Sequence, residues 1–143
     1  MAEENATVKV TEMDISTPID TNQALQVLGG CIQIFYSMLN QFEDMTLTKT
    51  MKDIVPTIKS QNFDEYKNLA HALKGASGYI GASRLHYVCY YIQEHHLKRR
   101  HQKMLEYYPS LVEAAIEFRV YSRKIIAEKD GMYRFLFLFD YLL

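Results

Sequence analysis

The chain has 143 residues, a formal net charge of −1 and an apolar fraction of 48 %. This length fits a single domain with its own core, and the near-neutral charge argues against the broad basic surface that nucleic-acid binding needs. No stretch reaches the roughly 18 apolar residues of a membrane span, and the acidic start at residues 1–4 lacks the apolar centre of a secretion signal. We therefore expect a cytoplasmic protein, nuclear as well if its source is eukaryotic, that binds neither nucleic acid nor membrane.

The first part of the chain predicts a tail and a short helix. Residues 1–17 are polar and predict a flexible N-terminal tail. Asp20, which follows Thr17 and Pro18, supplies the start signal for a short helix, and the pair Gly29-Gly30 should end or bend it.

A long helix is predicted next, with apolar residues on one side at Cys31, Ile34, Phe35, Met38, Leu39, Phe42 and Met45. The pattern weakens across residues 46–50 and resumes at Met51. Pro56 should kink the helix near residue 52 or break it there, because proline removes a backbone hydrogen bond and clashes with the preceding turn. One bent helix is the interpretation that we favour.

Three further helices follow. Asn62 can cap a helix over residues 63–79 that ends at Gly81, and Ser83 can cap a helix that extends to about residue 105. Pro109 fits the first turn of a last helix, which Asp130-Gly131 should stop.

The resulting fold prediction is all-α: an antiparallel four-helix bundle, with the short N-terminal helix laid across one end. The bundle domain should span residues 18–128, between the tail at 1–17 and an apolar C-terminal tail at 129–143, whose structure the sequence does not determine. Both cysteines, Cys31 and Cys89, fall on apolar stripes and are predicted to be buried, reduced thiols. We expect a monomer.

The helix over residues 63–79 carries the most informative pattern. Its core-facing stripe consists of Phe63, Tyr66, Leu69, Ala70, Leu73, Ser77 and Ile80. His71 lies well off this stripe, so its ring is expected in solvent, near Lys74, Gly75 and Gly78. Each glycine costs a helix about 1 kcal/mol relative to alanine. Two of them on this side therefore indicate a bare surface on which a partner macromolecule can reach the imidazole.

The segment His71-Ala72-Leu73-Lys74-Gly75-Ala76-Ser77, followed by Ile80-Gly81-Ala82, resembles the signature of histidine-containing phosphotransfer (HPt) domains. The next helix is similar to that of the family in the spacing of its Leu, Cys and Ile residues, and the resemblance extends from about residue 19 to residue 127. It implies a phosphorelay intermediate: His71 accepts a phosphoryl group from a receiver-domain phospho-aspartate and passes it to another receiver aspartate. The partners implied are receiver domains of hybrid histidine kinases and response regulators.

This role suits the residues. The ordinary pKa of histidine, near 6.5, leaves the imidazole mostly neutral and nucleophilic at pH 7. Lys74, one turn away, can stabilise charge on the transferring oxygens, because phosphoryl transfer depends mainly on positioning and charge neutralisation. The sequence holds no phosphate-binding loop, no kinase motif and no receiver-like aspartate cluster. We expect a carrier without kinase activity of its own or an intrinsic cofactor, which relies on Mg²⁺ supplied by the partner receiver.

The resemblance also assigns roles to residues around His71. Gln93 matches a polar position on the following helix that hydrogen-bonds the active imidazole in many members, and Gly75 matches the flat spot against which a receiver fits. Gly78, Lys67 and Asp64 are further candidates for partner binding. The remaining histidines, His86, His95, His96 and His101, are expected at the surface, and their spacing is not that of a zinc site.

Two alternatives stay open. The chain can be a helical adaptor that docks receiver domains without being phosphorylated, or the HPt domain of a hybrid histidine kinase. Retention of both His71 and Lys74 favours a working carrier, and the acidic N-terminal segment and the C-terminal tail favour a free-standing protein.

Overall fold

The computed structural model describes residues 13–142, with side chains described up to residue 129. In this part of the chain, every regular element is helical. The elements are α1 (Thr21–Val27), α2 (Ile32–Gln41), the π-helical turn η2 (Phe42–Leu47), α3 (Thr48–Ser60), α4 (Phe63–Tyr79), α5 (Ser83–Leu97) and α6 (His101–Leu142). The predicted all-α class is confirmed, and no helix among the described residues combines the length and apolarity of a membrane span.

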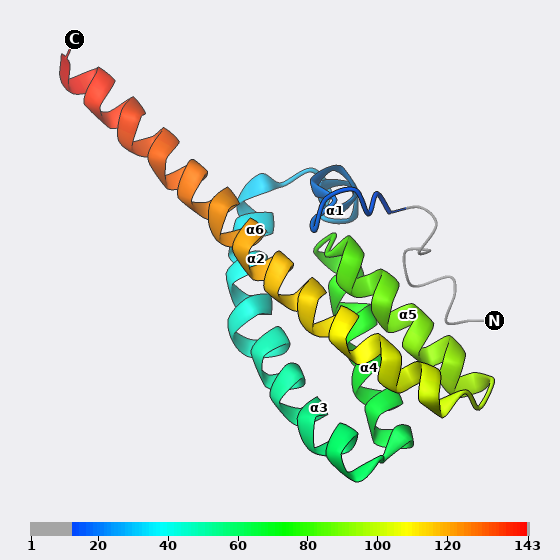
Figure 1. The fold of residues 1–143 in the computed structure, drawn as a ribbon. Helices are drawn as coiled ribbons and strands as arrows, with labels where there is room; N and C mark the ends of the chain where they lie inside the picture. Colours follow the sequence, from blue (N-terminus) through cyan, green and yellow to red (C-terminus); the bar gives the residue numbers. More distant parts are fainter. Residues whose placement is uncertain (1–12, 143) are drawn as a thin grey trace.

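Helices α4 and α5 form the centre of the bundle (Figure 1). They run antiparallel on either side of the connection at residues 80–82, with α3 packed against α4 and α6 packed against α5. The core between them includes Phe35, Leu39, Ile54, Tyr66, Leu73, Leu85, Ile92, Leu111 and Phe118, each fully buried. Beyond the bundle, α6 continues as a projecting helix (Figure 1).

The short helix α1 lies across the end of the bundle near the α4–α5 connection, as the sequence predicts (Figure 1). The amide of Asp20 donates to the carbonyl of Gly81 over 2.7 Å. Gly81 has φ +70°, and a Cβ there would lie 2.4 Å from the Asp20 carbonyl oxygen. Glycine is thus required at this position both by its left-handed backbone and by the close approach of α1.

Two of the three predicted N-caps are present, whereas the prediction for Ser83 is wrong, because Ser83 is the first residue of α5, the N-cap is Ala82 and no side chain caps this helix. The Asp20 carboxylate accepts from the amide of Gln23 over 3.1 Å, and the Asn62 side chain accepts from the amide of Glu65 over 3.2 Å. The second cap fixes the start of α4, which has the bounds that the sequence predicts. Eight residues separate this cap from His71, so the histidine lies in the middle of the helix.

The irregularity in the long second helix is not where the sequence places it. The chain is helical from α2 through α3 with Pro56 inside α3, and the departure from α-geometry is η2. Phe42 and Leu47 are both buried, and their five-residue spacing matches the i→i+5 hydrogen bonds of a π-helix, such as that from the Thr48 amide to the Glu43 carbonyl. One extra residue in the turn keeps both apolar side chains on the core, which explains the weakened pattern before Met51.

The boundary between the last two helices also differs from the prediction. The fourth predicted helix ends at Leu97 rather than near residue 105, and α6 already begins at His101, so Pro109 lies inside it. Arg99 has φ +57°, and the amides of Arg99 and Arg100 donate to the carbonyls of His96 and His95. These are the two bonds of a Schellman motif, which reverses the chain here without a glycine.

The first turns of α6 are stabilised by burial of Met104, whose carbonyl accepts a 3.1 Å hydrogen bond from the Tyr66 hydroxyl. These contacts offset the cost of a proline inside a helix, about 3 kcal/mol or more. At the other end, α6 passes through Gly131 instead of stopping there. A single glycine removes no hydrogen bond and costs only about 1 kcal/mol.

Two smaller expectations are corrected. Cys89 is buried, and burial raises the pKa of its thiol to about 12, but Cys31 precedes α2 and is exposed.

Of the predicted N-terminal tail, residues 1–12 lie outside the described residues, whereas residues 13–17 are held against α5. Arg84 donates to the carbonyls of Ile15 and Ser16, and Ser83 donates to that of Thr17.

Candidate functional site

His71 occupies the middle of α4, and its side chain is exposed. The ring does not stand alone, because Nδ1 lies 2.6 Å from the amide nitrogen Nε2 of Gln93 on α5. The contact expected from the position of Gln93 is therefore present in the structure. It leaves the second ring nitrogen of His71 as the one available to a reactant from solvent.

Lys74 lies one turn further along α4 and is half-buried. Its ammonium nitrogen lies 5.8 Å from the centre of the Tyr90 ring on α5, which is within the range of a cation–π interaction. The aromatic face keeps the lysine close to the seam between the two helices, on the same side as His71. Tyr90 is a site residue that sequence reasoning missed, and its only signal is a spacing of three residues before Gln93.

The two glycines expected on this surface have different environments. A Cβ built on Gly75 meets nothing within 4 Å, so the surface next to His71 is open there. Gly78 is buried, and a Cβ on it would lie 3.5 Å from Nδ1 of His86. The expectation that Gly78 belongs to an exposed docking surface is therefore wrong, because α5 covers this position.

His86 is likewise not a surface residue, since only 1 % of it is exposed. Its Nδ1 lies 3.0 Å from the backbone carbonyl oxygen of Lys74. No sequence pattern predicts burial of this histidine, and its side chain fits because Gly78, the residue opposite it on α4, has no side chain. His86 and Gly78 thus hold α5 against α4 next to the turn that carries Lys74.

The other two residues proposed for partner binding lie two turns and one turn before His71. Asp64 is exposed and accepts a 2.8 Å hydrogen bond from Nε2 of His96 on α5. This bond holds the pKa of the Asp64 carboxyl below its usual value, with a smaller contribution from the charge of Lys67. Lys67 is half-buried on the same helix. His101 stacks on Phe63, with ring centres 4.2 Å apart.

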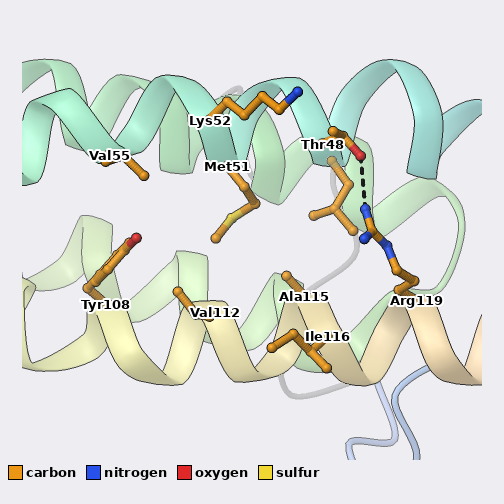
Figure 2. Close-up of a pocket in the computed structure, with 10 residues that line it drawn as sticks. Thr48, Met51, Lys52, Val55, Tyr108, Val112, Ala115, Ile116 and Arg119 are labelled. Atoms are coloured by element: carbon orange, nitrogen blue, oxygen red, sulfur yellow. Dashed lines mark hydrogen bonds between the residues drawn. The ribbon is translucent and has the colours of Figure 1, made fainter.

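A groove of about 400 Å³ lies between α3 and α6, away from all of these residues (Figure 2). Its walls are mostly apolar, and Arg119 closes one end by donating to the Thr48 hydroxyl over 3.2 Å. No predicted site residue lines it. Among the described residues, no group of three or more His, Cys, Asp or Glu side chains could hold a metal ion.

Comparison with known protein families agrees with this geometry. The family model of the Hpt domain matches residues 37–117, which is more than half of the chain and includes His71, Lys74, Gly75 and Gln93. The chain therefore belongs to the Hpt domain family. Neither the comparison with curated proteins nor that with solved structures gave a match.

Membership of this family carries a role in histidine phosphotransfer within a phosphorelay. It is the role of a phosphoryl carrier rather than that of a kinase, and receiver domains are the usual partners of such carriers.

Proposed function

We propose that this protein accepts a phosphoryl group on Nε2 of His71 from a receiver-domain phospho-aspartate and passes it to the aspartate of a second receiver. The observation that carries the proposal is the setting of the ring: exposed in mid-helix, with Nδ1 against Gln93 and Lys74 one turn away. A protein partner can reach this nitrogen, because Gly75 beside it presents no side chain.

The proposed chemistry requires Nδ1 to carry the proton, so that the lone pair of Nε2 is free. The oxygen of the Gln93 amide can accept a hydrogen bond from this Nδ1–H, because a rotation of 180° exchanges the amide oxygen and nitrogen. With the nitrogen placed towards His71, the amide oxygen Oε1 is buried without a hydrogen-bond partner among the described residues. The rotated amide would direct that oxygen to Nδ1–H and hold the tautomer that the reaction needs.

In the transfer step, Nε2 attacks phosphorus, the N–P bond forms, and the bond between phosphorus and the aspartyl oxygen breaks. The carboxylate of the donor receiver leaves, and the phosphorylated ring is cationic while Nδ1 keeps its proton. In the second transfer, the carboxylate of the acceptor attacks phosphorus and neutral imidazole leaves. Lys74 would stabilise the negative charge on the phosphoryl oxygens in both steps. We propose that the Mg²⁺ needed for this chemistry comes with the receiver.

The test is phosphoryl transfer from a purified phospho-receiver, with acid-labile phosphate measured on the chain. We expect the wild-type protein to be labelled, and His71→Gln and His71→Ala to remain unlabelled with almost unchanged helicity and melting temperature. Surface substitutions usually change stability by no more than about 0.5 kcal/mol. A His71→Ala protein that accepts label at the normal rate would refute the proposal. A wild-type protein that binds the receiver but is never labelled would support the adaptor alternative.

A further inference from the structure

A row of three contacts joins α4 to α5 at the proposed site. His86 lies against Gly78, the Lys74 ammonium lies 5.8 Å from the Tyr90 ring centre, and His71 meets Gln93 at 2.6 Å. The second contact lies four residues earlier than the first on α4 and four residues later on α5. The third contact lies three residues earlier than the second on α4 and three residues later on α5. All three contacts thus belong to one antiparallel register.

Of these three contacts, the one between His86 and α4 is the most constrained. The His86 ring is buried, and the 3.0 Å contact with a carbonyl requires that Nδ1 carry a proton and donate. The ring lies directly over Gly78, where an added Cβ would be 3.5 Å from Nδ1 and 3.6 Å from Cε1. A longer side chain at residue 78 would occupy the space of the ring. The fit therefore depends on both residues.

We propose that His86 is a positioning residue of the phosphotransfer site. Its hydrogen bond to the Lys74 carbonyl, made over Gly78, fixes the register of α5 on α4 that puts Gln93 against Nδ1 of His71. The bond ends on the backbone of Lys74, three residues from His71 on the same helix. His86 lies two helical turns from Gln93, so it touches no reactant and acts through Gln93. This inference rests on the proposed function and adds to it the means by which the imidazole is oriented.

The first test follows the tautomer of His71 by ¹⁵N NMR of the imidazole ring, which requires no phosphoryl transfer. In the wild-type protein we expect one dominant tautomer with the proton on Nδ1. His86→Leu removes the donor and should give a mixture of the two tautomers. His86→Asn returns a side-chain N–H near the position of Nδ1 and should restore the wild-type spectrum. Gly78→Leu should give the same mixture by displacing the ring from the α4 side.

A matched control separates positioning from a general loss of stability. Val88→Ala shortens another buried side chain of α5, one that lines a shallow pocket beside α6 rather than the seam with α4. It should lower the melting temperature and leave the tautomer of His71 unchanged. If Val88→Ala changes the tautomer as much as His86→Leu does, the effect reflects stability alone and the proposal is wrong.

The second test is a double-mutant cycle with Gln93, using phosphoramidate as the phosphodonor. His86→Leu and Gln93→Ala should each slow labelling of His71 about fivefold, the order of effect of one lost hydrogen bond. The double variant should be no slower than Gln93→Ala, because His86 acts through Gln93. Multiplied effects would show that the two residues act independently and would overturn the proposal. If a phospho-receiver does not label the wild type, the proposed function fails, and the NMR result alone decides whether His86 orients the ring.

Discussion

At the scale of single residues, the proposed site combines a candidate nucleophile with a candidate stabilising cation, and both contact α5. His71 is in contact with Gln93, and Lys74 lies beside the face of Tyr90. Each of the two α4 side chains would otherwise sample several rotamers at the surface. Contacts with α5 reduce that freedom, so that less entropy would be lost in the proposed binding of a phosphoryl group and a receiver.

Lys74→Ala should slow phosphoryl transfer without abolishing it, because the substitution removes charge stabilisation and keeps the nucleophile. Loss of one preorganised electrostatic contact costs about 10²–10³ in a buried site, and we expect roughly tenfold here because water screens a half-buried group. Single-turnover transfer from a phospho-receiver measures the effect. Lys59→Ala, at an exposed lysine near the end of α3, is the control and should transfer at the wild-type rate. An unchanged rate in Lys74→Ala would mean that this lysine is only a solvated charge.

At the scale of elements, the structure predicts the effects of substitutions on the open side of α4 and in the turn η2. A side chain at Gly75 would extend into open space next to the imidazole, since nothing lies within 4 Å of a Cβ at this position. The same openness means that a larger residue there strains nothing in the folded chain.

Gly75→Gln should therefore slow transfer from a receiver sharply and raise the melting temperature slightly. The gain in stability should reach up to about 1 kcal/mol, because glycine is a poor helix former. Phosphoramidate is small enough to pass the new side chain, so labelling by this donor should change much less. A lower melting temperature combined with intact receiver transfer would show that Gly75 serves packing and that the receiver docks elsewhere.

The turn η2 joins the first half of the bundle to α6 through a buried carboxylate. Glu43 is 5 % exposed, and its Oε1 lies 2.9 Å from Nε of Arg119 and 3.1 Å from Nε of Arg123. Two arginines from successive turns of α6 thus converge on one oxygen. The same residue's carbonyl accepts a hydrogen bond from the Thr48 hydroxyl over 2.8 Å.

Glu43→Ala should lower the free energy of unfolding by about 1–2 kcal/mol, because it removes charge-assisted hydrogen bonds and leaves two arginines that water can still solvate. Urea unfolding measures the change. Asp44→Ala, at the exposed neighbouring carboxylate, is the control and should be close to neutral. Phosphoryl transfer should be unaffected, since η2 supplies no residue to the site. An equal loss in both variants would contradict a specific role for Glu43.

At the scale of the whole molecule, the site and the closure of the bundle are carried by different pairs of helices. The contacts of His71 and Lys74 lie on α4 and α5, whereas α6 closes the bundle through Phe118, whose ring packs edge-on against Phe42 with centres 5.0 Å apart. Loss of the contact between Phe118 and Phe42 should therefore lower the stability of the bundle without changing the geometry around His71.

Phe118→Ala should lower the free energy of unfolding by about 3–5 kcal/mol, the usual cost of removing a buried phenylalanine. Below the shifted unfolding transition, the variant should still accept phosphate on His71 at close to the wild-type rate. Circular dichroism during denaturation and a transfer assay on the folded fraction measure the two effects. A fall in transfer that exceeds the loss of folded protein would show that α6 contributes to the site.

The sequence by itself predicted the features that depend on local chemistry. Asp20 and Asn62 mark helix starts because their side chains cap neighbouring amides, and Gly81 marks the end of α4 because it adopts a left-handed backbone. The motif around His71 also predicted the exposure of this residue and its contact with Gln93. These properties depend on spacing along one or two helices, which a sequence displays directly.

Only the tertiary structure decided what depends on a neighbouring element. Gly78 looked exposed and His86 looked like a surface residue, yet each buries the other because α5 lies against this part of α4. The chain reversal at Arg99 contains no glycine that would predict it from the sequence, since backbone hydrogen bonds form it. The turn η2 arises because two buried side chains five residues apart must reach one core. In each case, packing outweighed a local preference of about 1 kcal/mol, which is why the sequence pattern alone predicted otherwise.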